Sequence, residues 1–413
     1  MDIRTSERKF ISDVYGKVEI MLQEKVYEIL DGKAQEIVQI RRHLHSIAEP
    51  SMHEVETAKY IRDFYQGKDV EWLHYPVGAN GVVAKIKGGK PGKTIAIRAD
   101  FDAVAIKEET GLPYASKNPN ASHACGHDVH TAVALETADA LLQVRDELPG
   151  NVIMIHQYNE EIPPGGAREM IADGVLDGVD AILGMHVWPA YESGTIQYRP
   201  NITMTGRSRF KVEIIGKGGH GSQPDKCIDP IIAACHFMPA IQTIVSRRLD
   251  PTDAAVISIG RFDGPGMFNV IPSVVTLEGD VRNCSPRASA FIHQEFVKIL
   301  KGITEAFGCT YTLYYHDDYP AVINTEAIVD LALEAMKEHP IDGLKMVPGP
   351  MNMASEDFAM YLQQIPGMFV FLGARPEGEW YPNHNPKFVV DESCMVKGAK
   401  FFANVAIHFL ENQ

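Results

Sequence analysis

Four short apolar runs in this sequence are each followed, within a few residues or one loop, by side chains that can bind a metal ion. The runs are residues 94–97, 152–155, 181–185 and 368–372. Near-continuous apolar runs, separated by helical stretches such as residues 131–144, are typical of a sheet that helices cover on both faces. In such sheets the functional site lies at the carboxyl ends of the strands. The pattern therefore predicts an α/β fold with a mixed central sheet and a site at one edge of it.

The side chains after these runs are carboxylates and imidazoles, which transition metals accept as ligands. In chain order they are Asp100, Asp102, Glu160, Glu161, His186 and His384. Asp100 and Asp102 stand two residues apart on an extended segment and so share a face. We expect them to bind a metal or to orient one of its ligands.

A fifth candidate is the motif Cys125-Gly126-His127-Asp128. On an ideal helix, residues two apart diverge by about 200°, so Cys125 and His127 can bind one ion only where the backbone turns. Gly126 permits such a turn. A helical stretch follows directly, and a helix N-terminus is expected to lower the pKa of the Cys125 thiol.

Between residues 201 and 319 the order of elements changes to strand, helix, strand, strand, helix, strand. This βαββαβ order is typical of a compact, ferredoxin-like α+β unit. The predicted ranges are 210–215, 228–248, 254–262, 274–282, 286–307 and 310–315. Since helix and strand order resumes after it, we expect a discontinuous large domain, residues 1–200 and 320–413, with residues 201–319 inserted as a second domain.

Composition restricts the partners and the compartment. The formal charge of −15 argues against nucleic acid or an anionic membrane surface as a partner. No run approaches the 18 or more apolar residues of a membrane span, and residues 1–10 lack the apolar core of a signal peptide. Six scattered cysteines without a Cys-x-x-Cys pair are typical of a reducing compartment, so the sequence predicts a cytoplasmic protein.

Taken together, the motifs resemble the amidohydrolase branch of peptidase family M20, which includes hippurate hydrolases, N-acyl-amino-acid amidohydrolases and auxin-conjugate hydrolases. The matching stretches occur in family order between residues 98 and 386. They are Arg98-Ala99-Asp100-Phe101-Asp102, His123-Ala124-Cys125-Gly126-His127-Asp128, Glu160-Glu161, Gly184-Met185-His186, Gly216-Lys217-Gly218-Gly219-His220, Asn269-Val270-Ile271-Pro272, Ser355-Glu356-Asp357-Phe358 and His384-Asn385-Pro386.

The resemblance implies a small-molecule N-acyl amino acid as substrate, hydrolysed at its amide bond with two divalent metal ions. Mn²⁺ or Zn²⁺ is expected, with Co²⁺ and Ni²⁺ left open. The implied ligands are Cys125, His127, Glu161, His186 and His384. Glu160 matches the general base. His220 matches a histidine that steadies the oxyanion, in many relatives from the partner subunit.

The resemblance also makes the inserted domain a lid that often mediates dimerisation, so a homodimer or higher homo-oligomer is expected. Asn269 and Arg282 fall where relatives contact the substrate. Three departures from the family pattern border the site. His156-Gln157-Tyr158-Asn159 stands where relatives usually have Pro-Ala before the paired glutamates, Ile162-Pro163-Pro164 replaces a more glycine-rich loop, and Val104-Ala105 replaces the usual Leu-Pro.

Three other functions stay open at this point. Within the family, the chain could be a dipeptidase or an N-acetyl-diaminopimelate deacetylase. In a different class, Cys125 would be the nucleophile of a hydrolase with His127 as its base, which metal dependence distinguishes. A binding module without turnover is disfavoured by the presence of Glu160.

Overall fold

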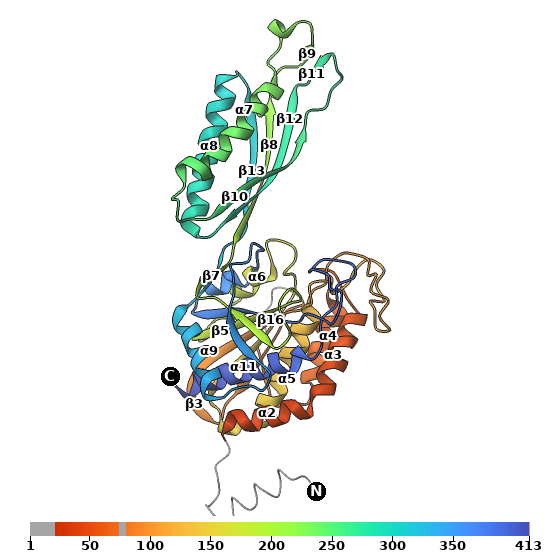
Figure 1. Cartoon of the computed structure of the whole chain (residues 1–413), viewed down its shortest axis with the longest axis vertical. Coiled ribbons are helices and arrows are strands. Elements are labelled where there is room, and N and C mark those ends of the chain that lie inside the picture. Colours follow the sequence, from red (N-terminus) through yellow and green to blue (C-terminus); the bar gives the residue numbers. More distant parts are fainter. Residues whose placement is uncertain (1–20, 74–79, 413) are drawn as a thin grey trace, which may run out of the picture.

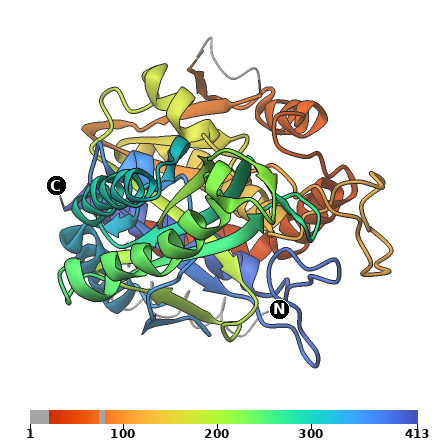
Figure 2. The ribbon, with the colours of Figure 1, turned by 90° about the horizontal axis from the view of Figure 1, so that it is seen from above.

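The computed structural model of the chain describes residues 21–73 and 80–412, which form two units stacked along one long axis (Figure 1). The inserted unit extends from β8 (Gly206–Ile215) to β13 (Thr310–Tyr319). The large unit contains the rest. Seen from above, the inserted unit lies across the large unit (Figure 2). No helix within the described residues is both long enough and apolar enough to span a membrane.

The large unit is built on an eight-stranded mixed sheet in the order β1-β2-β4-β3-β5-β16-β6-β15. The strands are β1 (Glu71–Trp72), β2 (Val82–Lys87), β3 (Lys90–Asp100), β4 (Pro149–Gln157), β5 (Ala181–Trp188), β6 (Thr195–Tyr198), β15 (Lys345–Pro348) and β16 (Gly367–Gly373). The four predicted apolar runs lie in β3, β4, β5 and β16. These four strands are adjacent and parallel, so their carboxyl ends meet at one edge.

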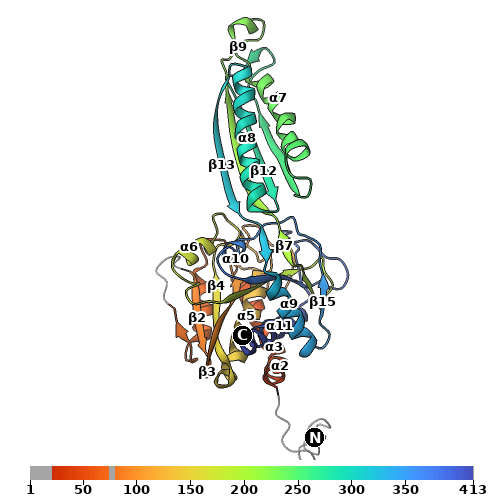
Figure 3. The ribbon, with the colours of Figure 1, turned by 90° about the vertical axis from the view of Figure 1, so that its left-hand side faces the viewer.

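Helices cover this sheet, as the sequence predicted. α5 (His127–Gln143) and α11 (Cys394–Glu411) pack against β3, and almost every residue of α5 is buried because α3 and α11 also contact it. The remaining helices of the large unit are α2 (Leu22–Gly32), α3 (Ala34–Ser46), α4 (Val55–Tyr65), α6 (Gly166–Ala172), α9 (Glu326–Glu338) and α10 (Ala359–Leu362), with a short 3-10 turn at Arg145–Glu147. α6 and α10 lie at the end nearer the inserted unit (Figure 3).

Two local predictions in this region change in detail. Charged and apolar residues interleave over residues 14–47 with few helix breakers, which predicts one helical run. The structure instead has two helices with a break at Lys33, whose φ of −100° and ψ of 7° are not helical. The part of that run before residue 21 lies outside the described residues. Asn80-Gly81, just before the apolar Val82-Val83, predicts a hairpin turn. β1 and β2 on either side of it do pair in antiparallel fashion, but residues 74–79, which enter this turn, lie outside the described part.

The inserted unit has the predicted βαββαβ order. Its strands β8, β10 (Ala255–Asp263), β12 (Val274–Asn283) and β13 form an antiparallel sheet in the order β10-β12-β8-β13. α7 (Pro230–Thr243) and α8 (Pro286–Ala306) lie on one face of it (Figure 3). A turn of π-helix, Ile244–Arg248, follows α7, and a 3-10 turn, Pro224–Lys226, precedes it. β9 (Gly219–His220) and β11 (Val270–Ile271) pair at the far tip (Figure 1).

The two units have separate hydrophobic cores. The buried cluster of the large unit includes Met204 and Tyr319, while that of the inserted unit lies between Phe210 and Cys309. β7 (Asn201–Met204) pairs with β14 (Val322–Asn324). The segment that leads into the inserted unit and the segment that leads out of it therefore lie side by side beneath that unit. The domain boundaries at residues 201 and 319 stay a prediction; the cores separate within a few residues of them.

Candidate metal centre

The parallel strands bring their polar ends to one edge of the large sheet. Asp100 ends β3, Glu160 and Glu161 follow β4, and His186 lies within β5. His384 comes from the loop after β16. This loop is held in place because the His384 N–H donates to the carbonyl of Ala124 at 2.8 Å.

The turn before α5 adds Cys125 and His127, and it requires a glycine between them. Gly126 has a φ of 91°, in the left-handed region, and caps the N-terminus of α5. A Cβ atom at this position would lie 2.3 Å from Cγ1 of Val187. Gly126 therefore lets the chain turn against β5 and aim both flanking side chains at one place.

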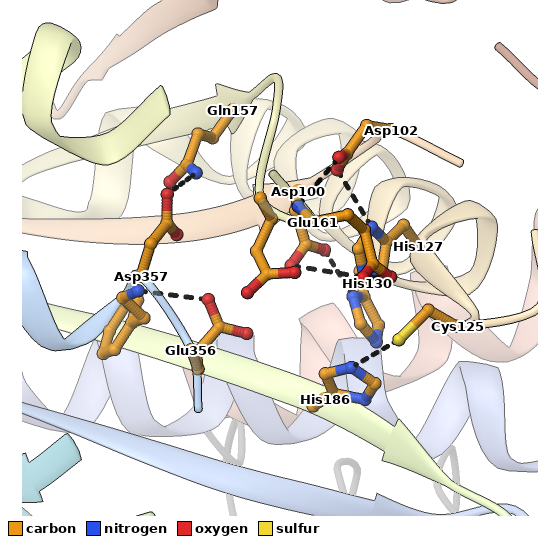
Figure 4. A network of polar contacts seen from close by, with 12 residues as sticks. Asp100, Asp102, Cys125, His127, His130, Gln157, Glu161, His186, Glu356 and Asp357 are labelled. Carbon is orange, nitrogen blue, oxygen red and sulfur yellow. Dashed lines mark hydrogen bonds and ion pairs between the residues drawn. The ribbon is translucent and has the colours of Figure 1, made fainter. Parts of the chain in front are cut away.

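Five candidate ligand side chains converge there (Figure 4 shows four of them pointing toward one another). Cys125 Sγ lies 3.3 Å from Nε2 of His186 and 3.3 Å from Nε2 of His384. Glu161 Oε1 lies 3.1 Å from Nε2 of His384 and 3.9 Å from Nε2 of His127. Three overlapping triplets have all their ligand atoms within 4.8 Å of one another: Cys125, His127, His186; Cys125, Glu161, His384; and His127, Glu160, Glu161.

The Nδ1 atoms of two of these histidines, His127 and His186, are occupied in the way that metal ligands require. Nδ1 of His127 lies 3.1 Å from Oδ1 of Asp102, and Nδ1 of His186 lies 2.8 Å from the carbonyl oxygen of Val187. Nε2 of His127 is buried without a hydrogen-bond partner among the residues that the structure describes. A carboxylate or carbonyl on one nitrogen, with the other left free, is the usual arrangement around a bound cation. The residues therefore fit a divalent metal centre.

His130 belongs to the same region but is not free to bind a cation. Its Nδ1 lies 2.5 Å from Oδ1 of Asp100, and its Nε2 accepts the N–H of Val187 at 2.8 Å. Both ring nitrogens are used. Asp100 also accepts from Arg98 at 2.6 Å, so it fixes the strand end and the helix start relative to each other. His130 was not predicted from the sequence, although its spacing of three from His127 places both on one face of α5.

Glu160 faces a second group of buried acids, Glu356 and Asp357. Burial raises the pKa of Glu160 well above its usual range, and the neighbouring carboxylates of Glu356 and Glu161 raise it further. Arg98 balances part of this charge, at 3.0 Å from Glu356 and 2.8 Å from Asp357. Glu356 and Asp357 belong to a motif that carries the family resemblance, but their place beside Glu160 was not predicted from the sequence.

The predicted effect on Cys125 is wrong in direction. The sequence predicted a thiol pKa lowered by the start of α5. Burial instead raises the pKa of Cys125 well above its usual range, and the carboxylates of Glu161 and Glu160 add to this. A helix N-terminus is a partial charge and cannot outweigh full burial beside two carboxylates. A bound divalent cation would favour the thiolate.

The centre opens into a cavity of about 460 Å³ between the two units. Its polar lining includes the base candidate Glu160 and four of the candidate metal ligands, Cys125, Glu161, His186 and His384. Its other walls are Trp188, Ala190, Met204, Arg207, Arg282, Tyr319, Ala354, Ser355, Glu356, Trp380, Pro382 and Asn383. Arg282, which was predicted to contact the substrate, is one of the residues that line this cavity.

His220 and Asn269, which were predicted to contact the oxyanion and the substrate, do not line this cavity. His220 belongs to β9, and Asn269 directly precedes β11, with its carbonyl accepting the N–H of Gly221 at 2.8 Å. β9 and β11 form the tip of the inserted unit farthest from the large sheet (Figure 1). Within one chain, the structure therefore does not bring His220 and Asn269 to the metal centre.

Comparison with known proteins identifies the family. The sequence model of peptidase family M20/M25/M40 matches residues 96–408, from the middle of β3 to α11. This chain belongs to that family. All the strand ends that build the metal centre fall within the matched part of this M20 chain.

Close relatives of this M20 chain extend over nearly its whole length. In Bacillus subtilis (strain 168), the protein YhaA is 41% identical over 391 residues, covering 94% of this chain and 98% of YhaA. An N-acetyl-L-cysteine deacetylase of the same organism is 38% identical, covering 92% of this chain and 89% of its own. The crystal structure of the Bacillus subtilis YXEP protein, described as a dinuclear metal binding peptidase from the M20 family, is 36% identical with a TM-score of 0.81, covering 93% of this chain and all of that one.

Family and relatives together make this chain an amidohydrolase of the M20 family, a hydrolase that acts on linear amide bonds in small molecules.

Proposed function

We propose that this M20 chain hydrolyses the amide bond of N-acyl amino acids, using two divalent metal ions and Glu160 as the general base. The observation that carries this is the convergence of the five candidate ligand side chains and the buried Glu160 beside a single cavity, which all of them line except His127. Cys125, His127, Glu161, His186 and His384 would hold the ions, Mn²⁺ or Zn²⁺, with Co²⁺ or Ni²⁺ also able to occupy such ligands. Bound there, the ions would supply Lewis acidity toward water and the amide carbonyl.

Glu160 would carry the proton through the reaction. A raised pKa suits a base that accepts a proton at neutral pH and later returns it. Glu160 removes a proton from the attacking water as the water oxygen forms a bond to the amide carbon. When the C–N bond breaks, Glu160 delivers that proton to the amine nitrogen. Its main chain is held during this by the Tyr319 hydroxyl, which donates to the Glu160 carbonyl at 2.5 Å.

Arg282 supports an amino acid on the amine side of the scissile bond. It lines the cavity at the base of the inserted unit, where a guanidinium can pair with the α-carboxylate. We also propose that the protein is a homodimer in which His220 of a second copy steadies the oxyanion, since β9 lies at the tip of its own chain. All six cysteines are free thiols, which supports a cytoplasmic location.

Replacing Glu160 tests the proposal. Glu160→Gln should keep its bound metal, because the ligand side chains are unchanged, and lose at least about a hundredfold in kcat. Glu192→Gln, at an exposed glutamate, is the matched control and should behave as wild type. Metal content by mass spectrometry and hydrolysis of N-acetyl amino acids are the two readouts. Wild-type kcat in Glu160→Gln would remove Glu160 as the base.

The alternative with Cys125 as nucleophile is disfavoured by its pKa. A nucleophilic cysteine needs a lowered pKa to form its thiolate, whereas burial raises that of Cys125. Full activity after exhaustive chelation would favour this alternative over the metal centre.

A further inference from the structure

A row of three side chains crosses the base of the inserted unit, above the metal centre. Arg207 on β8 is the direct cross-strand partner of Arg282 on β12 and of Tyr319 on β13. Directly opposed residues of neighbouring strands point to the same face of a sheet. All three line the same cavity as Glu160 and four of the candidate metal ligands.

The contacts of Arg207 leave part of its guanidinium group available to bind a ligand. Its Nε lies 3.2 Å from Oδ1 of Asp280 and 3.5 Å from Oδ2 of Asp318. Each of these acids has a nearer partner, since Arg282 lies 2.7 Å from Asp280 and Arg209 lies 3.0 Å from Asp318. The two terminal amino groups of Arg207 make no hydrogen bond to the residues that the structure describes.

The acidic partners of Arg207 are also shared. Among the residues that the structure describes, Arg207, Arg209 and Arg282 form ion pairs with two carboxylates, Asp280 and Asp318, and His316 also lies 3.0 Å from Asp318. Of these arginines, Arg207 and Arg282 line the cavity, and Arg209 does not. Arg207 therefore presents to the substrate space a positive charge whose two acidic partners, Asp280 and Asp318, are shared with other arginines, while Glu160, Glu161 and Glu356 line the same cavity. The side chain of Arg207 is 35% exposed, so its planar group can reach a ligand without leaving a buried site.

We propose that Arg207 is a specificity-determining residue that binds a second carboxylate of the substrate. The substrate class is then an N-acyl amino acid with an acidic side chain of aspartate or glutamate length, because Asp280 holds the two arginines side by side. This inference rests on the proposed function, in which Arg282 pairs with the α-carboxylate. A guanidinium presents two parallel N–H groups to a carboxylate, and a neutral amide of the same shape cannot match that pairing.

Binding to a protein that cannot turn over tests this directly. In the Glu160→Gln background with metal bound, we expect N-acetyl-L-glutamate to bind about tenfold more tightly than N-acetyl-L-glutamine, measured by titration calorimetry. Adding Arg207→Met should reduce that ratio to less than about twofold. Arg207→Lys keeps the charge without the planar fork and should give an intermediate ratio. Arg209→Met is the matched control, an arginine that shares Asp318 but lies outside the cavity, and should leave the ratio unchanged.

The outcomes separate this inference from the function it rests on. Equal affinity for the two ligands, or a preference that survives Arg207→Met, would overturn the role of Arg207 and leave the amidohydrolase reaction standing. A preference lost in Arg282→Met but kept in Arg207→Met would overturn it as well. If instead the wild-type enzyme hydrolysed no N-acyl amino acid, the proposed function itself would fail. Thermal unfolding of each variant confirms that any lost preference is measured on folded protein.

Discussion

Asp102 holds the imidazole of His127 through a 3.1 Å contact between Oδ1 and Nδ1, so that Nε2 is left buried and free at the metal centre. Asp102 is itself fixed, because its Oδ2 accepts from Ser51 Oγ at 2.6 Å and from the N–H of Glu161 at 3.1 Å. The Asp102 carboxylate therefore orients the ring of His127, a candidate ligand at the start of α5. It also fixes the backbone of Glu161, a second candidate ligand that follows β4.

Replacing Asp102 should weaken metal binding without unfolding the protein. Asp102→Asn keeps the shape but loses the charge that orients and polarises His127, and we expect metal affinity to fall by about 10 to 100-fold. Competition with a chromogenic chelator measures this. Ser51→Ala removes only one support of Asp102 and should cost less. An unchanged affinity in Asp102→Asn would contradict this role.

Metal binding should release protons and weaken as the pH falls. Although burial lowers it, the carboxylates of Asp100 and Asp102 raise the pKa of His127 to about 10, so at neutral pH the metal-free ring carries a proton that a cation must displace. At pH values below the pKa of His127, the apparent affinity for the metal should fall about tenfold for each unit by which the pH is lowered, for each proton that the metal displaces. Titration in two buffers of different ionisation enthalpy counts the protons. No proton release at pH 7 would show that His127 is already neutral.

Tyr319→Phe should impair turnover more than substrate binding. The change removes the hydrogen bond to the Glu160 carbonyl, which costs about 1 kcal/mol of the free energy of unfolding. Because Glu160 is then less firmly placed, kcat should fall several-fold while KM changes little. Tyr314→Phe, at an exposed tyrosine on the same strand, is the control. A rise in KM at constant kcat would instead indicate that Tyr319 serves only the substrate.

His156 should make the protein sensitive to acid. It is buried in β4, its Nε2 lies 2.8 Å from the Tyr65 hydroxyl, and burial lowers its pKa to about 3. The unfolded chain binds a proton near pH 6.5 and the folded one does not, so stability present above 6.5 is lost as the pH falls toward 3, by about 1.4 kcal/mol per unit. His156→Gln keeps an acceptor for Tyr65 and cannot titrate.

Unfolding by denaturant at pH 7 and pH 5 provides the comparison for His156. Any direct effect of the substitution on stability is the same at both pH values. The free energy of unfolding should therefore fall between pH 7 and pH 5 by about 2 kcal/mol less in His156→Gln than in the wild type. Equal losses in the two proteins would show that His156 is not buried as a neutral ring.

The sequence predicted those parts of the site that follow from local order. Apolar runs with polar ends predicted β3, β4, β5 and β16 and the edge at which they meet, because a parallel strand needs little more than a continuous apolar stretch. Gly126 between Cys125 and His127 likewise indicated a turn from three residues alone.

What the sequence did not predict depends on contacts between distant segments. Arg98 is balanced by Glu356 and Asp357, more than 250 residues away, and Tyr319 reaches back to Glu160 across the two units. The pKa of Cys125 was predicted in the wrong direction because burial by the surrounding fold outweighs the local effect of a helix N-terminus. The position of His220 at the far tip depends on the length of the inserted sheet, which no motif encodes.

We propose above all that this protein hydrolyses N-acyl amino acids at its metal centre. The most direct measurement is hydrolysis of a panel of N-acetyl, N-benzoyl and indole-acyl amino acids and dipeptides by protein stripped of metal and then reloaded with Zn²⁺ or Mn²⁺. We expect no activity after stripping and its return on reloading, with N-acyl amino acids cleaved faster than dipeptides. Undiminished activity in the stripped protein would contradict this proposal.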